Sequence, residues 1–176
     1  MDDNPVVSAE RAIRTAIILN EELTKMNEKY PALSEDPIRI RFGINTGEII
    51  LCDIGSADAR IDLTIIGDPV NLASRLESAS KQYGIANLIS EHSIKSLLDL
   101  FGARIIDSVR VKGKNEPVEC YELFNFKEKV SENEQRLIRL FNEGIGYYRK
   151  KAFKKALSIF EKTEGMEKSG ETGQIS

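Results

Sequence analysis

A proline-started helix between two short apolar segments restricts the fold of this chain more than any other feature. Helical spacing begins at Asp68-Pro69 and ends at Gly84, with the apolar runs Leu63–Ile66 before it and Ile85–Ile89 after it. Proline is well tolerated at the first helical position because the N–H it lacks would have no intrahelical partner there, and Asp68 is a suitable N-cap. The order strand, helix, strand predicts a domain in which helices pack on a sheet.

The region before this unit predicts a helix and two strands. Apolar residues follow helical spacing from Ser8 to Tyr30, with Ser8 available as the N-cap. Alternating apolar residues then predict a strand over 38–44, and Ile49–Cys52 follows after a tight turn. We expect these two strands to pair as an antiparallel hairpin.

The region after the unit predicts a helix capped by Ser90, with Ile94, Leu97, Leu98 and Phe101 on its inner side. Two strands follow, over about 104–111 and 118–126, joined by the turn 112–117. The pattern up to residue 127 is therefore that of one domain.

The last part of the chain is helical. Ser131 and Glu134 have the spacing of a capping box, and no strand pattern appears after them. Six residues have spacings that resemble one tetratricopeptide repeat: Leu140, Gly144, Tyr147, Phe153, Ala156 and Phe160. We expect three parts: a domain over 1–127, a tetratricopeptide-like helical hairpin over 131–168, and a disordered tail over 169–176.

Composition excludes several classes of function. The net charge of -3 gives no support for sequence-independent attraction to nucleic acid or to an anionic membrane. No apolar run is long enough to span a bilayer and no secretion signal begins the chain, so a cytoplasmic location is expected. His92 is the only histidine, and Cys52 and Cys120 have no zinc-like spacing.

Asn71 and Arg75 are the first candidates for chemistry. They are four residues apart on the proline-started helix, so their side chains project from one face near its N-terminus. Val70, Ala73 and Leu76 are expected to pack on the neighbouring face. A helix N-terminus with an adjacent guanidinium suits phosphate oxygens, although an arginine on such a helix is more often a solvated surface charge.

Four segments together resemble the class III adenylyl/guanylyl cyclase catalytic domain, in the order and spacing of that family. They are Arg39–Gly47 (RIRFGINTG), Ile54–Ser56, Leu63–Glu77 (LTIIGDPVNLASRLE) and Val111–Leu123. The resemblance covers roughly residues 5 to 126 and implies an α+β, ferredoxin-like cyclase fold that lacks its first strands and is followed by the C-terminal helical hairpin. It further implies a homodimer, arranged head to tail, with nucleotide sites between the subunits.

The resemblance also implies a reaction and residue roles. ATP, in preference to GTP, would be converted to a 3′,5′-cyclic nucleotide and pyrophosphate in signal transduction. Asn71 would orient the ribose, and Arg75 would stabilise charge developing at the α-phosphate. Lys112 would contact the terminal phosphates. Thr64 falls at a base-reading position, where threonine accompanies adenine.

The same resemblance places the metal site outside this sequence. In the family two divalent cations, Mg²⁺ or Mn²⁺, are held by aspartates of strands N-terminal to the first helix seen here. Asp53, Asp58 and Asp62 do not occupy those positions. The alternative function is therefore a catalytically incomplete cyclase-homology module that acts in dimerisation, nucleotide binding or protein recruitment through the helical hairpin.

Overall fold

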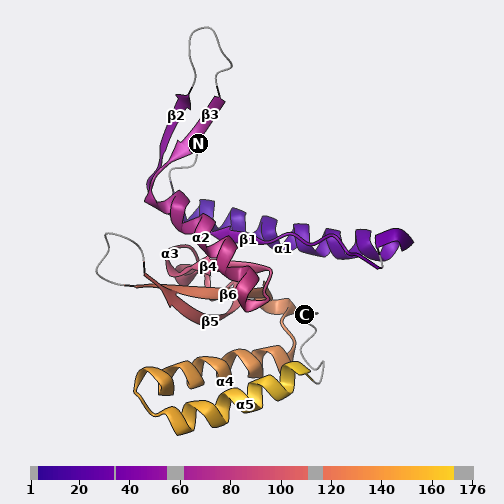
Figure 1. Ribbon diagram of the computed structural model, residues 1–176, viewed down its shortest axis with the longest axis vertical. Coiled ribbons are helices and arrows are strands. Elements are labelled where there is room, and N and C mark those ends of the chain that lie inside the picture. The colour runs from indigo at the N-terminus through magenta and orange to yellow at the C-terminus, as the bar shows by residue number, and fades with distance from the viewer. Residues whose placement is uncertain (1–3, 34, 55–61, 111–116, 169–176) are drawn as a thin grey trace.

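The computed structural model describes residues 4–33, 35–54, 62–110 and 117–168 (Figure 1). The elements in chain order are α1 (Pro5–Lys29), η1 (Pro31–Leu33), β1 (Phe42–Ile44), β2 (Ile50–Ile54), β3 (Asp62–Ile66), α2 (Asp68–Tyr83), β4 (Asn87–Ser90), α3 (Glu91–Ile94), η2 (Lys95–Leu97), β5 (Phe101–Val109), β6 (Val118–Phe126), η3 (Lys127–Lys129), α4 (Glu132–Arg149) and α5 (Phe153–Lys168). Within these residues no helix combines the length and apolarity that crossing a bilayer needs.

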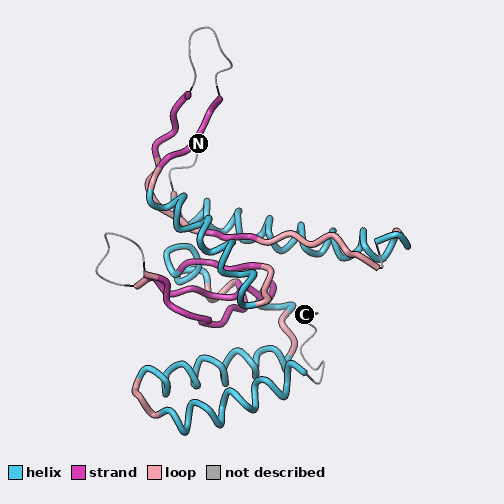
Figure 2. The backbone as a smooth tube through the Cα atoms, viewed as in Figure 1, coloured by secondary structure: helices cyan, strands magenta, loops and turns pink. Residues whose placement is uncertain are grey.

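The strands form two separate sheets (Figure 2). The four-stranded sheet has the order β1-β4-β6-β5, in which β1 runs parallel to β4 and the other neighbours are antiparallel. Strands β2 and β3 pair with each other and project from the body as an arm. The predicted hairpin of 38–44 with 49–52 is therefore wrong, because β1 pairs with β4 and β2 pairs with β3.

Helices cover the main sheet on both faces. Neighbouring residues of a strand point to opposite faces, and Leu88 and Ile89 of β4 belong to different core clusters. Ile89 packs with the α1 residues Ile13 and Ile17, whereas Leu88 packs with α2. The sheet therefore has α1 on one face and α2 on the other, and the core is built on either side of β4.

Two helix starts differ from the sequence expectation. Helix α1 begins at Pro5, and its N-cap is Asn4, whose side chain accepts a hydrogen bond from the Val6 N–H at 3.0 Å. Ser8 is therefore inside the helix. Helix α2 has Gly67 as its N-cap and Asp68 in its first turn, and it ends as expected at Gly84, which has φ 69. A proline at the first or second helical position starts both helices.

The helix predicted after Ser90 is shorter than expected. Only α3 is α-helical; η2 continues it as a 3-10 turn, and Phe101 already begins β5. Ser90 stands at the N-cap position of α3 without a capping hydrogen bond. Its hydroxyl donates to Asn45 Oδ1 instead.

The helical hairpin α4–α5 packs against the main sheet. Ser131 and Glu134 form the predicted capping box at its start. A Cβ on Gly102 of β5 would lie 2.5 Å from Val130, and the Ile105 N–H donates to Asn142 Oδ1 of α4 at 2.9 Å. The hairpin thus covers part of β5, which is an edge strand of the sheet.

Candidate active site

The structure places Asn71 and Arg75 on the exposed side of α2, within its first two turns. The buried side of the helix carries Leu72 and Leu76, of which Leu76 is fully enclosed. Val70 and Ala73 are only partly buried, so of the three residues expected to pack, Leu76 alone is buried, and Leu72 is buried beside it. Both candidate side chains can therefore face a ligand or a second molecule.

Gly43 of β1 and Gly47, shortly after that strand, seat α2 close to the sheet. A Cβ on Gly43 would lie 2.0 Å from the Ala73 carbonyl oxygen and 2.4 Å from the Glu77 backbone nitrogen. A Cβ on Gly47 would lie 2.5 Å from Pro69 Cγ. Since real Cβ contacts are not this short, glycine is what allows the helix to approach.

The first turn of α2 has few N–H groups left for an anion, and it carries a negative charge of its own. The Val70 and Asn71 N–H groups donate to the Gly67 carbonyl, at 3.1 and 3.3 Å. The acidic residue Asp68 lies in the same turn, where it interacts favourably with the helix dipole. An anion bound here would have to be held mainly by Arg75 to overcome the Asp68 charge.

Thr64 lies on the arm, in strand β3, at the register position opposite Cys52. Its side chain is half-buried. Among the described residues no hydrogen bond joins Thr64 to Asn71 or Arg75, so the structure keeps the proposed base reader and the α2 pair as two separate groups. Lys112 lies outside the residues that the structure describes.

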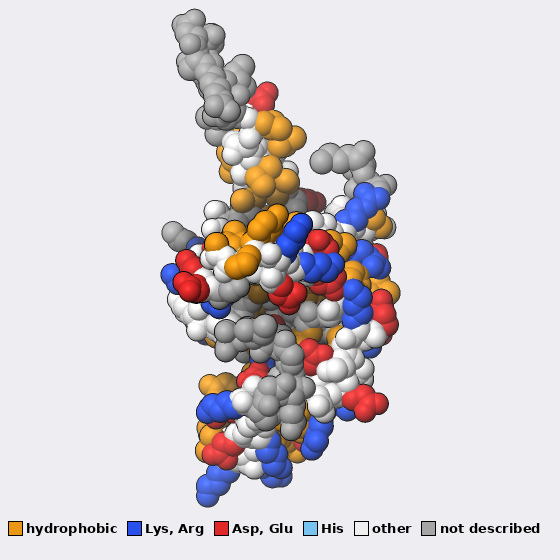
Figure 3. All heavy atoms as spheres, turned by 90° about the vertical axis from the view of Figure 1, so that its right-hand side faces the viewer, with side chains coloured by type: hydrophobic (Ala, Val, Ile, Leu, Met, Phe, Trp, Pro, Cys, Tyr) orange, Lys and Arg blue, Asp and Glu red, His pale blue; other side chains and the backbone are white. Residues whose placement is uncertain are grey.

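The arm has an apolar surface that this chain does not cover. Six large hydrophobic residues on it are exposed: Ile49, Ile50, Leu51, Leu63, Ile65 and Ile66. Ile50 and Leu63 each leave 67% of their surface accessible. Figure 3 shows hydrophobic side chains gathered along this projection. Such a patch marks a site of contact with another molecule.

The described residues do not fit a metal site. No group of three or more His, Cys, Asp or Glu side chains in that part of the chain is arranged to hold an ion. Asp53 is on β2, and Asp58 falls outside the described residues. We therefore assign no catalytic step to a metal held by these residues.

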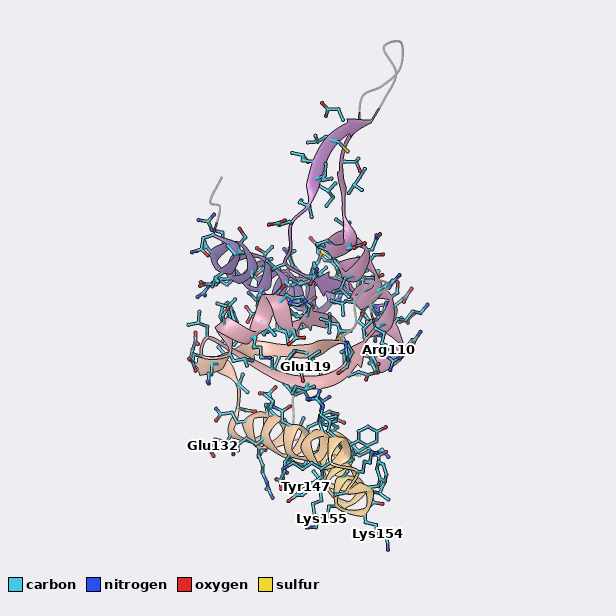
Figure 4. The ribbon with its side chains drawn as sticks, turned by 90° about the vertical axis from the view of Figure 1, so that its left-hand side faces the viewer. Arg110, Glu119, Glu132, Tyr147, Lys154 and Lys155 are labelled. Carbon is cyan, nitrogen blue, oxygen red and sulfur yellow. The ribbon has the colours of Figure 1, made fainter. Side chains whose placement is uncertain are left out.

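A second polar cluster links the sheet to the helical hairpin, and sequence reasoning did not find it. Arg149 of α4 donates to Glu119 of β6 at 2.6 Å, and the Tyr121 hydroxyl donates to the same carboxylate at 2.8 Å. Burial alone would raise the pKa of Glu119, but the hydrogen bonds from Tyr121 and Arg149 outweigh it and hold that pKa below its usual value. Figure 4 shows Glu119 on the sheet, and Tyr147, Lys154 and Lys155 on the hairpin.

The comparisons with known proteins agree on one family. A family model described as the adenylate and guanylate cyclase catalytic domain matches residues 4–125. An adenylate cyclase of Anabaena cylindrica is 38% identical over 119 residues, which cover 64% of this chain and 24% of that protein. Adenylate cyclase 1 of Rhizobium meliloti is 32% identical over 126 residues, covering 72% of this chain and 19% of that protein. The chain thus spans a quarter or less of the length of these relatives.

Solved structures confirm the predicted fold class. The adenylyl cyclase CyaB from P. aeruginosa aligns with a TM-score of 0.60 and 32% identity, over 73% of this chain and 65% of that one. A guanylyl cyclase aligns with a TM-score of 0.54 and 28% identity, over 69% of this chain and 60% of that one. The mixed α+β body with added C-terminal helices is consistent with a ferredoxin-like cyclase fold that lacks its first strands.

Proposed function

Because the chain belongs to the family of adenylate and guanylate cyclase catalytic domains, we propose that it supplies the transition-state half of a nucleotide cyclase active site. The observation that supports this proposal is the pair Asn71 and Arg75, exposed on one side of α2 and one turn apart. The site is completed by a second subunit, and the product is a 3′,5′-cyclic nucleotide.

The reaction needs groups that stabilise charge on the α-phosphate. The ribose 3′-oxygen bonds to the α-phosphorus, the bond from that phosphorus to the oxygen bridging the β-phosphate breaks, and pyrophosphate leaves. The proton of the 3′-hydroxyl is released in the same process. Arg75 is always charged and presents a planar array of donors to the phosphate oxygens. One preorganised donor of this kind contributes about 10²- to 10³-fold to kcat.

Asn71 and Thr64 act on the nucleoside in this proposal. The Asn71 amide can donate and accept at once, and it orients the ribose. The Thr64 hydroxyl accepts a hydrogen bond from the adenine amino group, so ATP is preferred to GTP. Lys112 contacts the terminal phosphates. The identity with adenylate cyclases supports this order of preference.

The partner in this site is a second cyclase domain, in the first instance a copy of this chain. The exposed apolar arm supports such a contact, since Ile50 and Leu63 are each 67% exposed. Thr64 lies on the same arm, and α2 begins directly after it. An arm that binds the partner therefore brings the base-reading residue to the seam between the two chains.

A mixing experiment tests the proposal. This chain is combined with the catalytic domain of the Anabaena cylindrica adenylate cyclase in which the positions aligned with Asn71 and Arg75 are alanine. With ATP and Mn²⁺ we expect cyclic AMP from the mixture and not from either protein alone. Arg75→Ala in this chain should lower the rate by at least about 10²-fold, whereas Lys81→Ala, which removes an exposed cation on the same helix, should preserve it. A rate for Arg75→Ala within about threefold of the parent rate would end the proposal.

The second candidate is a catalytically incomplete module that binds nucleotide, dimerises or recruits a protein. Two observations favour it: the described residues hold no group for a metal, and the hairpin exposes Tyr148 and Phe153. Nucleotide binding by calorimetry without product in any mixture would support this second function. GTP in place of ATP, in the same assay, separates the two substrates.

A further inference from the structure

A partly buried polar cluster lies beneath the first turn of α2 and has no part in the function described so far. Asn45 Nδ2 donates to the Pro69 carbonyl at 3.1 Å, and Ser90 Oγ donates to Asn45 Oδ1 at 2.6 Å. The Pro69 carbonyl can only accept, so the amide nitrogen of Asn45 must face it. Ser90 is fully enclosed, at 0% exposure. Asn45 is therefore held from one side and binds α2 from the other.

A second pair of hydroxyls, next to the first, holds the same loop. Thr46 Oγ1 and Ser93 Oγ are 2.8 Å apart, and Ser93 is buried at the start of α3. Ser90 and Ser93 are themselves 3.5 Å apart. The segment that carries Asn45 is thus fastened to α3 and to the end of β4, which are parts of the main body.

Three alternate residues of this segment face α2. Gly43 lies against Ala73 and Glu77, Asn45 binds Pro69, and Gly47 lies against the Pro69 ring. The glycines allow close approach but do not hold the helix, because they have no side chain. Asn45 is the one of the three whose side chain donates a hydrogen bond to α2. The residue that accepts this bond, Pro69, is two positions before Asn71.

We propose that Asn45 is a positioning residue for the cyclisation reaction, which fixes the first turn of α2 through the Pro69 carbonyl and so sets how Asn71 and Arg75 meet the nucleotide. This inference rests on the function proposed above. A donor stabilises a transition state only when it is already in place, and a displacement of about 1 Å can cost on the order of 10²-fold in rate. Asn45 acts through α2 and does not touch the substrate.

The test measures kcat and KM in the mixing assay for Asn45→Ala. We expect kcat to fall about 10²-fold, with KM for ATP changing less than about threefold, because ground-state binding depends less on alignment. The matched control is Asn20→Ala, which removes a hydrogen bond between amide side chains, from Asn20 Nδ2 to Asn87 Oδ1 at 3.0 Å, on the α1 side. The control keeps its kcat.

A second variant separates alignment from folding. Asn45→Asp keeps the shape and the acceptor for Ser90 but removes the N–H that binds Pro69, so it should lower kcat as Asn45→Ala does. Hydrogen exchange of the Leu72 and Ala73 amides should rise about tenfold in both Asn45 variants and stay unchanged in Asn20→Ala. These exchange rates can be measured on this chain alone.

Each outcome decides the inference. A kcat for Asn45→Asp within about threefold of the parent, in a mixture where Arg75→Ala lowers kcat at least about 10²-fold, would overturn the inference and leave the proposed function standing. Equal losses in Asn45→Ala and Asn20→Ala would reduce Asn45 to a stabilising residue and also overturn it. No turnover in the parent mixture would remove both proposals.

Discussion

Arg104 of β5 and Glu122 of β6 form an ion pair that is enclosed between the main sheet and the helical hairpin. Arg104 Nε donates to Glu122 Oε2 at 2.6 Å, and the two side chains are 7% and 3% exposed. The guanidinium lies over the Phe141 ring of α4, 4.5 Å from its centroid. Its Nη1 is 2.6 Å from Glu167 of α5, as an ion pair without hydrogen-bond geometry. One buried cation therefore contacts two strands and both helices of the hairpin.

Replacing Arg104 alone should destabilise the protein strongly. Arg104→Met leaves the Glu122 carboxylate in the interior without its arginine, at an expected cost of about 3–5 kcal/mol in the free energy of unfolding. The double variant Arg104→Met with Glu122→Leu should recover most of that loss, because no buried charge remains. Urea denaturation measures both. A loss below about 1 kcal/mol for the single variant would mean that the pair is solvated.

Two glycine-to-alanine changes should have opposite signs. Gly43→Ala places a Cβ 2.0 Å from the Ala73 carbonyl oxygen, which is backbone and cannot move without shifting α2. We expect a loss of about 1–3 kcal/mol or more in stability. Gly146→Ala, inside α4, meets nothing within 4 Å and should stabilise the protein by about 0.5–1 kcal/mol. Thermal denaturation measures the change in stability of both variants. Equal changes in melting temperature would contradict the close approach of α2 to Gly43.

The Glu119–Arg149 pair should make stability depend on pH in the acid range. The folded-state pKa of Glu119 is lowered from 4.5, so its contribution is complete above that value and is lost as pH falls through the folded-state pKa. Arg149→Met should therefore lower stability at neutral pH, by less than about 1 kcal/mol since the arginine is half exposed. The difference should shrink towards pH 3, as measured by urea midpoints. In a Glu119→Gln background the same replacement should have no pH-dependent effect.

A lysine on the arm should weaken association with the partner domain. Leu63→Lys puts a charge into the exposed apolar surface, and we expect the dissociation constant, measured by sedimentation, to rise at least about tenfold. Leu157→Lys is the matched control, because Leu157 is exposed to a similar degree, 59%, but lies on α5. Since both sites are at the surface, neither change should lower the melting temperature appreciably. Equal effects on association would place the interface elsewhere.

Local signals explain which elements could be predicted. Helix α2 has a proline at its start and Gly84 at its end, and both act through backbone geometry that neighbours do not override. The capping box at Ser131 is local in the same sense. The partner of β1 could not be predicted, because alternation shows which face of a strand is buried and not which strand lies beside it.

The candidate site was predictable in part for the same reason. Residues four apart lie on the same face of any helix, so the sequence alone indicated that Asn71 and Arg75 project from one side of α2. That Thr64 lies on a projecting arm depends on the pairing of β2 with β3, which alternation does not specify. Asn45 was missed because asparagine in a turn is ordinary, and its bond to Pro69 spans 24 residues.

The packing of the hairpin on β5 has a practical consequence for anyone who divides this protein. A fragment cut after residue 127 would remove Phe141 and Glu167 from above Arg104 and the Asn142 amide from the β5 edge. The exposed guanidinium and the Ile105 N–H would then have to find water, and Gly102 would lose its contact with Val130. Composition changes at residue 131, but the contacts of β5 extend to Glu167 near the end of α5, so recombinant boundaries belong beyond that helix.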